Sequence, residues 1–188
     1  RCEKMTRTVR CIEVLCLGFL ILAGGSSIAE TPTIIFRFPE SFSELPPTVS
    51  SSLAKEGCRI PQATIERKIV ATNVISGEFA QKNQMDWAIL CSKDGRSYIR
   101  VFWGGAAHCP SRIDKGRDIF QEDIAQGLEF DRALGTVDRS FILQHYQAYG
   151  GPKPPTITHL GINYAYLEKA SQVHYCYNNK WLTLTGAD

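Results

Sequence analysis

Two pairs of potential metal ligands stand out in this sequence: His108 with Cys109, and His174 with Cys176. Alternate residues of a strand share a face, so His174 and Cys176 would lie side by side if their segment is extended. Two histidines and two cysteines can form a zinc site. Such a site would consume two cysteines that an oxidising compartment pairs instead. We therefore predict disulfides and ordinary histidines, no metal and no cofactor, with His108 and His174 left as the candidate ligands.

The sequence carries none of the common catalytic motifs. It has no Gly-x-Ser-x-Gly elbow, no His-Glu-x-x-His and no phosphate-binding glycine loop. Ser92, His145 and Asp138 have no spacing that ties them into a triad. Glu78 and Asp86 could act as a general-acid pair, but we expect Asp86 to cap the turn into its strand and Glu78 to be a polar loop residue. We predict no catalytic residue and lean towards a protein that is not an enzyme.

Residues 77–89 read Gly-Glu-Phe-Ala-Gln-Lys-Asn-Gln-Met-Asp-Trp-Ala-Ile. This stretch resembles the calcium loop of FG-GAP and VCBS-type β-propeller blades, in which alternating oxygens coordinate Ca²⁺. The resemblance puts the ligand positions at Glu78, Ala80, Lys82 and Asp86. Alanine has no side-chain oxygen and lysine adds a positive charge, whereas calcium needs six to eight oxygen ligands. We expect a loop of similar shape that binds no calcium, with Lys82 replacing the charge of the ion.

The first 29 residues have the pattern of a secretory signal peptide. A basic region precedes the apolar run 14–23, and the small-x-small site Ser27-Ile28-Ala29 follows it. About ten apolar residues are too few to span a bilayer, which needs roughly 20. Cleavage after Ala29 would leave a single domain, residues 30–188, that is secreted or periplasmic and has no membrane span. An uncleaved anchor is the alternative.

Removing that leader changes the charge and the cysteine count. The chain has 21 basic and 19 acidic residues. The leader holds four of the basic and two of the acidic residues, so residues 30–188 have 17 of each and no net charge. Nucleic acid is excluded as a partner because its binding needs clustered Lys and Arg. The remaining cysteines are Cys58, Cys91, Cys109 and Cys176. We predict two disulfides; three pairings are possible, and reduced, buried cysteines are the alternative.

Residues 30–188 also resemble a group of uncharacterised bacterial exported proteins. The matching stretches are Gly57–Gln62, Asn73–Phe79, Asp86–Ser92, His145–Pro152 and Glu168–Ser171, with Lys180-Trp181 near the end. The resemblance implies export and a single domain, and it implies no particular chemistry.

The clearest elements are two hairpins and two helices. Residues 86–103 form β-rich runs around Asp94-Gly95, a pair that supplies the positive φ angles of a tight turn. On the second run Tyr98, Arg100 and Phe102 should face one way, and Ile99, Val101 and Trp103 the other. A second hairpin spans 172–184 and turns at Asn178-Asn179. Helices are predicted at 47–56, closed by Gly57, and at 138–149, where Ile142, Tyr146 and Tyr149 should form the packed face.

The other segments are predicted with less regularity. Strands are expected at 64–71, 128–130 and 158–167, a turn around 114–117, and one helical turn at 121–126. Together these elements predict an α+β fold of antiparallel β-hairpins packed with one or two helices and stapled by disulfides.

The predicted function is that of an exported, non-catalytic protein that binds a protein or a cell-envelope ligand. Trp87, Trp103 and Trp181, with the tyrosines of the hairpins, either form core and cross-strand pairs or a binding face for carbohydrate or protein. A hydrolase of unrecognised type is the alternative and would need a deep polar pocket holding His108 or His145. A secreted enzyme inhibitor, with the loop 104–115 protruding, is a special case of the binding-protein hypothesis. The oligomeric state is left open.

Overall fold

The computed structural model describes residues 34–65, 68–70, 72–118, 121–123 and 127–187. The expected signal peptide, residues 1–29, lies outside the described residues. The protein is an α+β fold in which helices pack on antiparallel sheets, as the sequence predicted. Within the described residues, neither helix is long and apolar enough to cross a membrane.

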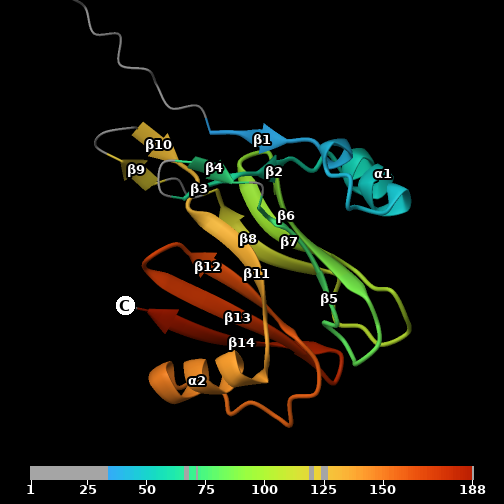
Figure 1. Cartoon of the computed structure of the whole chain (residues 1–188), viewed down its shortest axis with the longest axis vertical. Coiled ribbons are helices and arrows are strands. Elements are labelled where there is room, and N and C mark those ends of the chain that lie inside the picture. Colours follow the sequence, from blue (N-terminus) through green and yellow to red (C-terminus); the bar gives the residue numbers. More distant parts are fainter. Residues whose placement is uncertain (1–33, 66–67, 71, 119–120, 124–126, 188) are drawn as a thin grey trace, which may run out of the picture.

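Four layers follow one another along the long axis of the molecule (Figure 1). Helix α1 packs on one sheet, a second sheet lies below the first in this view, and helix α2 covers the far face of the second. The layers are α1 (Pro47–Glu56), the N-terminal sheet of β5 (Val74–Gly77), β6 (Asp86–Lys93), β7 (Arg96–Phe102) and β8 (Arg112–Arg117), the C-terminal sheet of β11 (Arg132–Val137), β12 (Gly161–Tyr166), β13 (Ala170–Tyr177) and β14 (Lys180–Ala187), and α2 (Arg139–Tyr149).

Three pairs of short antiparallel strands and one 3₁₀ turn complete the described elements. They are β1 (Phe36–Arg37) with β2 (Ile60–Pro61), β3 (Ala63–Ile65) with β4 (Lys68–Val70), β9 (Gln121–Asp123) with β10 (Gly127–Glu129), and η1 (Pro39–Ser41).

Each interface between layers has its own apolar core. The two faces of a strand point to different layers, so alternate residues feed different cores. Between α1 and the N-terminal sheet lie Phe42, Leu45, Val49, Leu53, Cys58, Ile60, Ile89, Cys91 and Tyr98. Between the two sheets lie Phe79, Ala88, Leu90, Ile99, Val101, Phe130, Leu134 and Ile162. Between the C-terminal sheet and α2 lie Val137, Ile142, Ile157, Val173, Tyr175 and Leu184.

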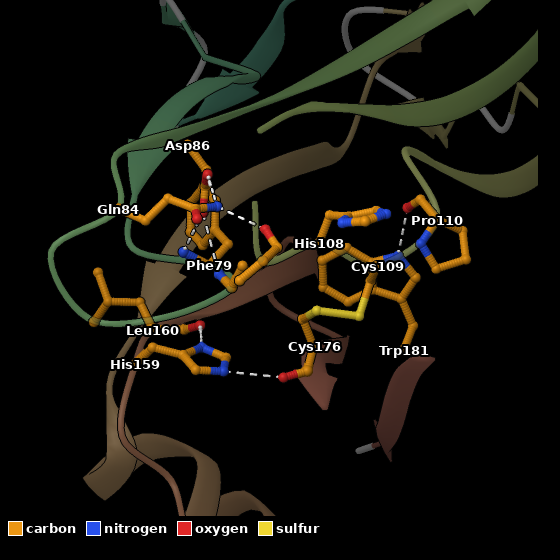
Figure 2. The surroundings of a disulfide bond; sticks show 12 residues. Phe79, Gln84, Asp86, His108, Cys109, Pro110, His159, Leu160, Cys176 and Trp181 are labelled. Carbon is orange, nitrogen blue, oxygen red and sulfur yellow. Dashed lines mark hydrogen bonds between the residues drawn. A yellow bond between two sulfur atoms is a disulfide. The ribbon is translucent and has the colours of Figure 1, made fainter. Parts of the chain in front are cut away.

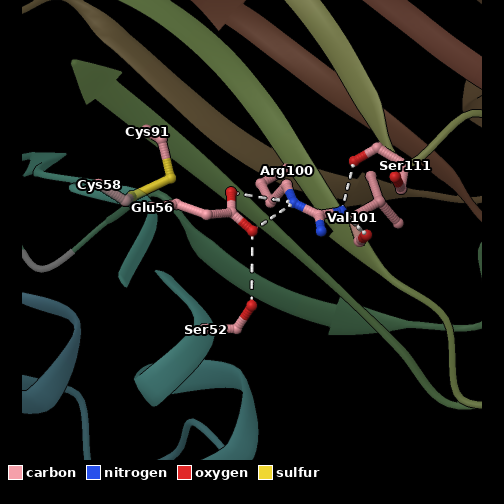
Figure 3. Close-up of polar contacts among 7 residues, drawn as sticks. All are labelled: Ser52, Glu56, Cys58, Cys91, Arg100, Val101 and Ser111. Carbon is pink, nitrogen blue, oxygen red and sulfur yellow. Dashed lines mark hydrogen bonds and ion pairs between the residues drawn. A yellow bond between two sulfur atoms is a disulfide. The ribbon is translucent and has the colours of Figure 1, made fainter. Parts of the chain in front are cut away.

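Helix α1 begins and ends where the sequence predicted. Pro47 occupies its first turn, and Gly57 closes it with φ 75°. An ion pair then fastens the helix to the sheet: Arg100 Nε on β7 donates to both carboxylate oxygens of Glu56, at 3.1 and 3.2 Å (Figure 3). Arg100 Nη1 also donates to the carbonyls of Val101 and Ser111, which anchors the start of β8.

Both predicted hairpins form. Asp94 and Gly95 take φ 52° and 71° between β6 and β7, and the predicted faces are correct: Tyr98 packs towards α1, whereas Ile99 packs between the sheets. In the second hairpin, Asn178 and Asn179 take φ 49° and 60° and connect β13 to β14. Short polar side chains tolerate this left-handed backbone better than β-branched ones.

Helix α2 is also confirmed, with one change to its packed face. Asp138 is the N-cap and accepts a hydrogen bond from the Phe141 backbone N–H at 2.9 Å. Ile142 is buried as predicted, but Tyr149 is 51% exposed. The buried polar residue on this face is His145, one turn before Tyr149.

Several predictions for the less regular segments were wrong. The described residues of the expected strand 64–71 belong to two strands, β3 and β4, which pair antiparallel. The expected turn at 114–117 lies inside β8, and the expected helical turn at 121–126 is strand β9 over residues 121–123. In both cases pairing with a neighbouring strand, β7 for β8 and β10 for β9, overrides weak local preferences. Strand β11 was not anticipated at all, and its partner β12 is distant in sequence.

The two disulfides are Cys58–Cys91 and Cys109–Cys176. The first ties the segment after α1 to β6. The second ties the loop after β7 to β13, and so joins the two sheets. The prediction of two bridges is confirmed, and this pairing is one of the three that the sequence allowed.

Candidate functional site

The loop that resembles a calcium loop is organised by a buried carboxylate. Asp86 is fully buried at the start of β6. Its Oδ2 accepts hydrogen bonds from the backbone N–H groups of Phe79 and Ala80, at 3.0 and 3.1 Å. Its Oδ1 accepts from the Gly104 N–H and from Gln84 Nε2, at 2.9 and 2.8 Å (Figure 2). Asp86 therefore caps the turn into its strand, as the sequence predicted.

The side chains of Glu78 and Lys82 are not among the groups that hydrogen-bond to that carboxylate in the described part of the chain. Lys82 is exposed, and none of the ion pairs found among the described residues includes it. Glu78 is half-buried, and its backbone carbonyl accepts from the Leu160 N–H. Gln84 is buried and bridges Asp86 to the carbonyl of Ala107. That the loop binds no calcium stays a prediction.

The four residues of the candidate zinc site do not come together as metal ligands. Cys109 and Cys176 form a disulfide, so neither offers a thiolate (Figure 2). His108 is exposed on the loop after β7, and its Nδ1 donates to the carbonyl of Ala106. His174 is buried on β13. Among the described residues, no three histidine, cysteine, aspartate or glutamate side chains gather as metal ligands.

The three residues tested as a triad also lie apart. Ser92, on β6, donates to Asp118 at 2.5 Å. Asp138 caps α2, and His145 Nε2 bonds to the Ser171 hydroxyl at 3.0 Å beneath that helix. No hydrogen bond found among the described residues links any two of the three.

A cavity of about 300 Å³ opens between the two sheets. Its walls come from the edge strand β8 on one side and from the C-terminal sheet on the other. The lining residues are Asp114, Lys115, Arg132, Tyr164, Tyr166, Ala170, Ser171, Gln172, Thr185 and Gly186. Neither His108 nor His145 lines it, so the polar pocket that a hydrolase with those histidines would need is not this one.

A β-bulge places Lys115 in this cavity. Opposite β7, Ser97 pairs with Gly116, but the next residue, Tyr98, pairs with Asp114. Lys115 is thus the extra residue of β8 and has no partner opposite. Gly116 takes φ 86° beside it. Bulges bend an edge strand and re-aim its side chains, and they are common next to functional sites.

The amine of Lys115 meets three groups of the C-terminal sheet. It lies in close hydrogen-bond contact with His174 Nε2, it donates to Gln172 Oε1 at 2.9 Å, and it sits 4.4 Å from the ring centre of Tyr164. Burial lowers the pKa of Lys115 to about 8. Burial, together with the nearby Lys115 charge, lowers the pKa of His174 to about 3, so His174 is neutral.

Arg132 supplies the second cation of the cavity. It is buried, its guanidinium lies 3.5 Å from the ring centre of Tyr166, and one nitrogen pairs with Asp131 at 2.5 Å. Burial raises the pKa of the Asp131 carboxyl, and Arg132 opposes that rise. Burial likewise raises the pKa of Tyr164, which keeps its hydroxyl protonated.

Sequence reasoning missed Lys115 and Arg132 because it assigned the first to a turn and gave the second no element. A signal was present in the partner strands. Tyr164 with Tyr166, and Gln172 with His174, alternate at the spacing of residues that share one face of a strand. Tyr164, Tyr166 and Gln172 on those faces line the cavity in the structure.

The polar side chains that line the cavity are two cations, one exposed carboxylate, the Gln172 amide, the Thr185 hydroxyl and two tyrosines. Such a wall suits a ligand that brings negative charge, because a buried cation gains most from an anion that replaces its water. Comparison with family models, curated proteins and solved structures found nothing that matches this chain.

Proposed function

We propose that this protein is an exported, non-catalytic binding protein, that its ligand is an acidic carbohydrate of the cell envelope, and that a carboxylate of this ligand enters the cavity beside Lys115. The observation that carries the proposal is the presence of two cationic side chains, Lys115 and Arg132, on the wall of one cavity between the sheets. Apolar side chains fill the rest of the space between the sheets.

The charge balance of the cavity favours an anion. Arg132 is already paired with Asp131, and the lining carboxylate Asp114 is exposed and paired with Arg112. Lys115 takes part in none of the ion pairs found among the described residues. Because its pKa is about 8, most Lys115 amines are protonated at neutral pH, and a bound carboxylate would hold more of them so.

The size and polarity of the cavity suit a sugar acid. A volume of about 300 Å³ is at the small end of ligand pockets and fits about one sugar ring. The Gln172 amide, the Thr185 hydroxyl and the tyrosine hydroxyls offer partners for sugar hydroxyls. Export is supported by the leader pattern of residues 1–29 and by two disulfides, which persist in oxidising compartments.

Calorimetric titration of the protein with oligogalacturonate, a chain of sugar carboxylates, tests the proposal. A neutral malto-oligosaccharide of equal length is the control ligand. We expect the acidic oligosaccharide to bind and the neutral one not to bind. Lys115→Gln should weaken binding about tenfold, which corresponds to about 1.4 kcal/mol. Lys153→Gln, which removes an exposed lysine outside the cavity, is the matched control.

Three results would overturn the proposal: equal binding of both oligosaccharides, equal affinity of the Lys115→Gln and Lys153→Gln variants, or no binding of the acidic oligosaccharide. Each variant is first compared with the unchanged protein by thermal unfolding, so that loss of the fold is not mistaken for loss of the site.

A further inference from the structure

We propose that the cavity also accepts small 2-oxo carboxylic acids, in which a ketone stands beside the carboxylate, and that Lys115 binds them covalently as a reversible imine. The inference rests on the proposed function, since the same cavity must first accept the carboxylate.

The first support is the placement of the amine. Lys115 is the unpaired residue of the bulge in β8, and it reaches across from the edge of one sheet to the inner face of the other. An ordinary surface lysine has a hydrated, mobile head. This amine is held by three neighbours and still lines an open cavity of about 300 Å³.

The second support is the pattern of donors and acceptors around it. Gln172 Oε1 can only accept, so it takes one N–H of Lys115. The neutral ring of His174 can take a second N–H on Nε2 while its Nδ1–H donates to Thr183 Oγ1 at 3.0 Å. With both N–H bonds of a neutral amine used in this way, its lone pair stays uncommitted. That lone pair is the nucleophile of imine formation.

The third support is the neighbouring cation. Arg132 lines the same cavity, and only one of its nitrogens is used by Asp131. A guanidinium binds a carboxylate through two parallel hydrogen bonds and so fixes its orientation. A 2-oxo acid held by Arg132 would present its ketone within the cavity that Lys115 lines, which is why this class is preferred to a simple aldehyde.

The step balances without any additional reactant. The lone pair of Lys115 Nζ attacks the ketone carbon, and the carbonyl π electrons move to oxygen. Two protons leave the nitrogen, the oxygen departs with them as water, and a C=N bond replaces the C=O bond. Nothing is oxidised or reduced, and hydrolysis reverses the step. The lowered pKa of Lys115 supports the availability of the neutral amine.

Reductive trapping on the unaltered protein tests the inference. The protein is incubated with pyruvate and sodium cyanoborohydride, which reduces an imine to a stable secondary amine. Peptide mapping by mass spectrometry then locates the gain, which equals pyruvic acid less one oxygen atom. We expect Lys115 to be labelled about tenfold or more faster than the exposed lysines near neutral pH, because far more of its amine is neutral.

The pH profile gives a second readout. Labelling of Lys115 should rise through about pH 8, whereas labelling of exposed lysines should keep rising through the ordinary lysine range. The groups that face the amine are His174, Gln172 and Tyr164, with Arg132 and Asp114 also lining the cavity. His174 is neutral throughout this range, so the rise reports Lys115 itself.

Lactate separates the two proposals, because it keeps the carboxylate of pyruvate but has no ketone. If oligogalacturonate binds and lactate competes with it, but pyruvate leaves no label on Lys115, the imine is excluded and the binding function stands. If oligogalacturonate does not bind, the proposed function fails. Labelling spread evenly over exposed lysines, or labelling of Lys153 at the rate of Lys115, overturns the inference. Lys115→Arg should abolish the trapped product, with Lys153→Arg as the matched control.

Discussion

Asp86 is buried and Lys115 is half-buried, and the two ionisable side chains differ in how fully their hydrogen bonds are satisfied. The carboxylate of Asp86 is fully buried and accepts four hydrogen bonds, three of them from backbone N–H groups. Lys115 has two hydrogen-bond partners and an open cavity in front of it. Satisfied buried charges rigidify a structure, whereas an amine with spare capacity is available to a ligand.

Replacing Asp86 by Asn should destabilise the protein strongly. An amide has one accepting oxygen, and its NH₂ group would face N–H donors that then lose their partner. We expect the free energy of unfolding to fall by about 3 kcal/mol, because hydrogen bonds to charged groups and unsatisfied buried donors carry the largest costs. Urea unfolding near neutral pH measures this change.

Lys82→Gln is the control for that experiment, since Lys82 belongs to the same loop but is exposed. This substitution should change the free energy of unfolding by no more than about 0.5 kcal/mol. If Lys82→Gln instead destabilises the fold as much as Asp86→Asn, then the lysine charge, and not the network around Asp86, holds the loop.

His174 should make stability depend on pH. Its pKa is about 3 in the folded protein, below the ordinary 6.5. As the pH falls below 6.5, the unfolded chain therefore takes up a proton that the folded protein cannot hold. The contribution of neutral His174 to the free energy of unfolding is present in full above pH 6.5. It falls as the pH falls, by about 2 kcal/mol at about pH 5. Unfolding in urea between about pH 7 and about pH 5 measures the loss.

His174→Gln is uncharged at every pH and isolates this effect from that of other groups. Its stability should fall about 2 kcal/mol less than that of the unchanged protein over the same range. Parallel curves for the two proteins would mean that His174 accepts a proton in the folded state. The charged group facing His174 is Lys115 on β8; Thr183 and Trp181 on β14 face it uncharged.

At the scale of the elements, small local features decide how helices and strands meet. The bulge in β8 turns one residue of an edge strand towards the other sheet. Gly186 on β14 plays a similar part for α2. A Cβ atom there would lie 2.6 Å from His145 Nε2 and 2.8 Å from the Tyr149 ring, so the helix sits directly on the glycine backbone.

Gly186→Ala should therefore push α2 away from the C-terminal sheet. We expect the free energy of unfolding to fall by about 1–3 kcal/mol, which is typical of overpacking. Gly135→Ala on β11 is the matched control, because no atom lies within 4 Å of its Cβ position and neither glycine has a positive φ. Thermal unfolding of both variants measures the difference. Equal effects would show that strand propensity, and not contact with α2, determines the cost.

At the scale of the whole molecule, long-range ties hold the layers together. Cys109–Cys176 joins the loop after β7 to the C-terminal sheet. The buried amide of Asn73 adds a second tie, because its Nδ2 donates to the carbonyls of Pro61 and Arg132 and its Oδ1 accepts from the Leu134 N–H. Both ties cross between parts of the chain that are far apart in sequence.

Removing the two disulfides separately should loosen different parts of the molecule. Cys109→Ala with Cys176→Ala should speed amide exchange in β13 and in the loop before β8, whereas Cys58→Ala with Cys91→Ala should affect the segment after α1 and β6. Removing either disulfide should lower the free energy of unfolding by about 4 kcal/mol, given sequence separations of 67 and 33 residues. Hydrogen exchange read by mass spectrometry checks the location. The same pattern in both variants would contradict it.

The sequence by itself determined the elements whose signals are local. The Asp94-Gly95 and Asn178-Asn179 turns take the positive φ angles that their residue types allow, and the strands beside them alternate as predicted. Gly57 and Asp138 likewise mark helix ends through their own backbone and side-chain chemistry. Asp86 was expected to cap its turn because of its place at the start of a strand.

Only the tertiary structure decided which distant segments meet. The disulfide pairing, strand β11 and the four-layer order all depend on contacts between residues far apart in the chain. The same holds for the candidate site. Lys115 lies in a segment that looks like a turn, and its role comes from a bulge against β7 and from His174 and Gln172, more than fifty positions later. Local preferences are weak beside the free energy of pairing and burial, so long-range packing made the cavity and chose the residues that line it.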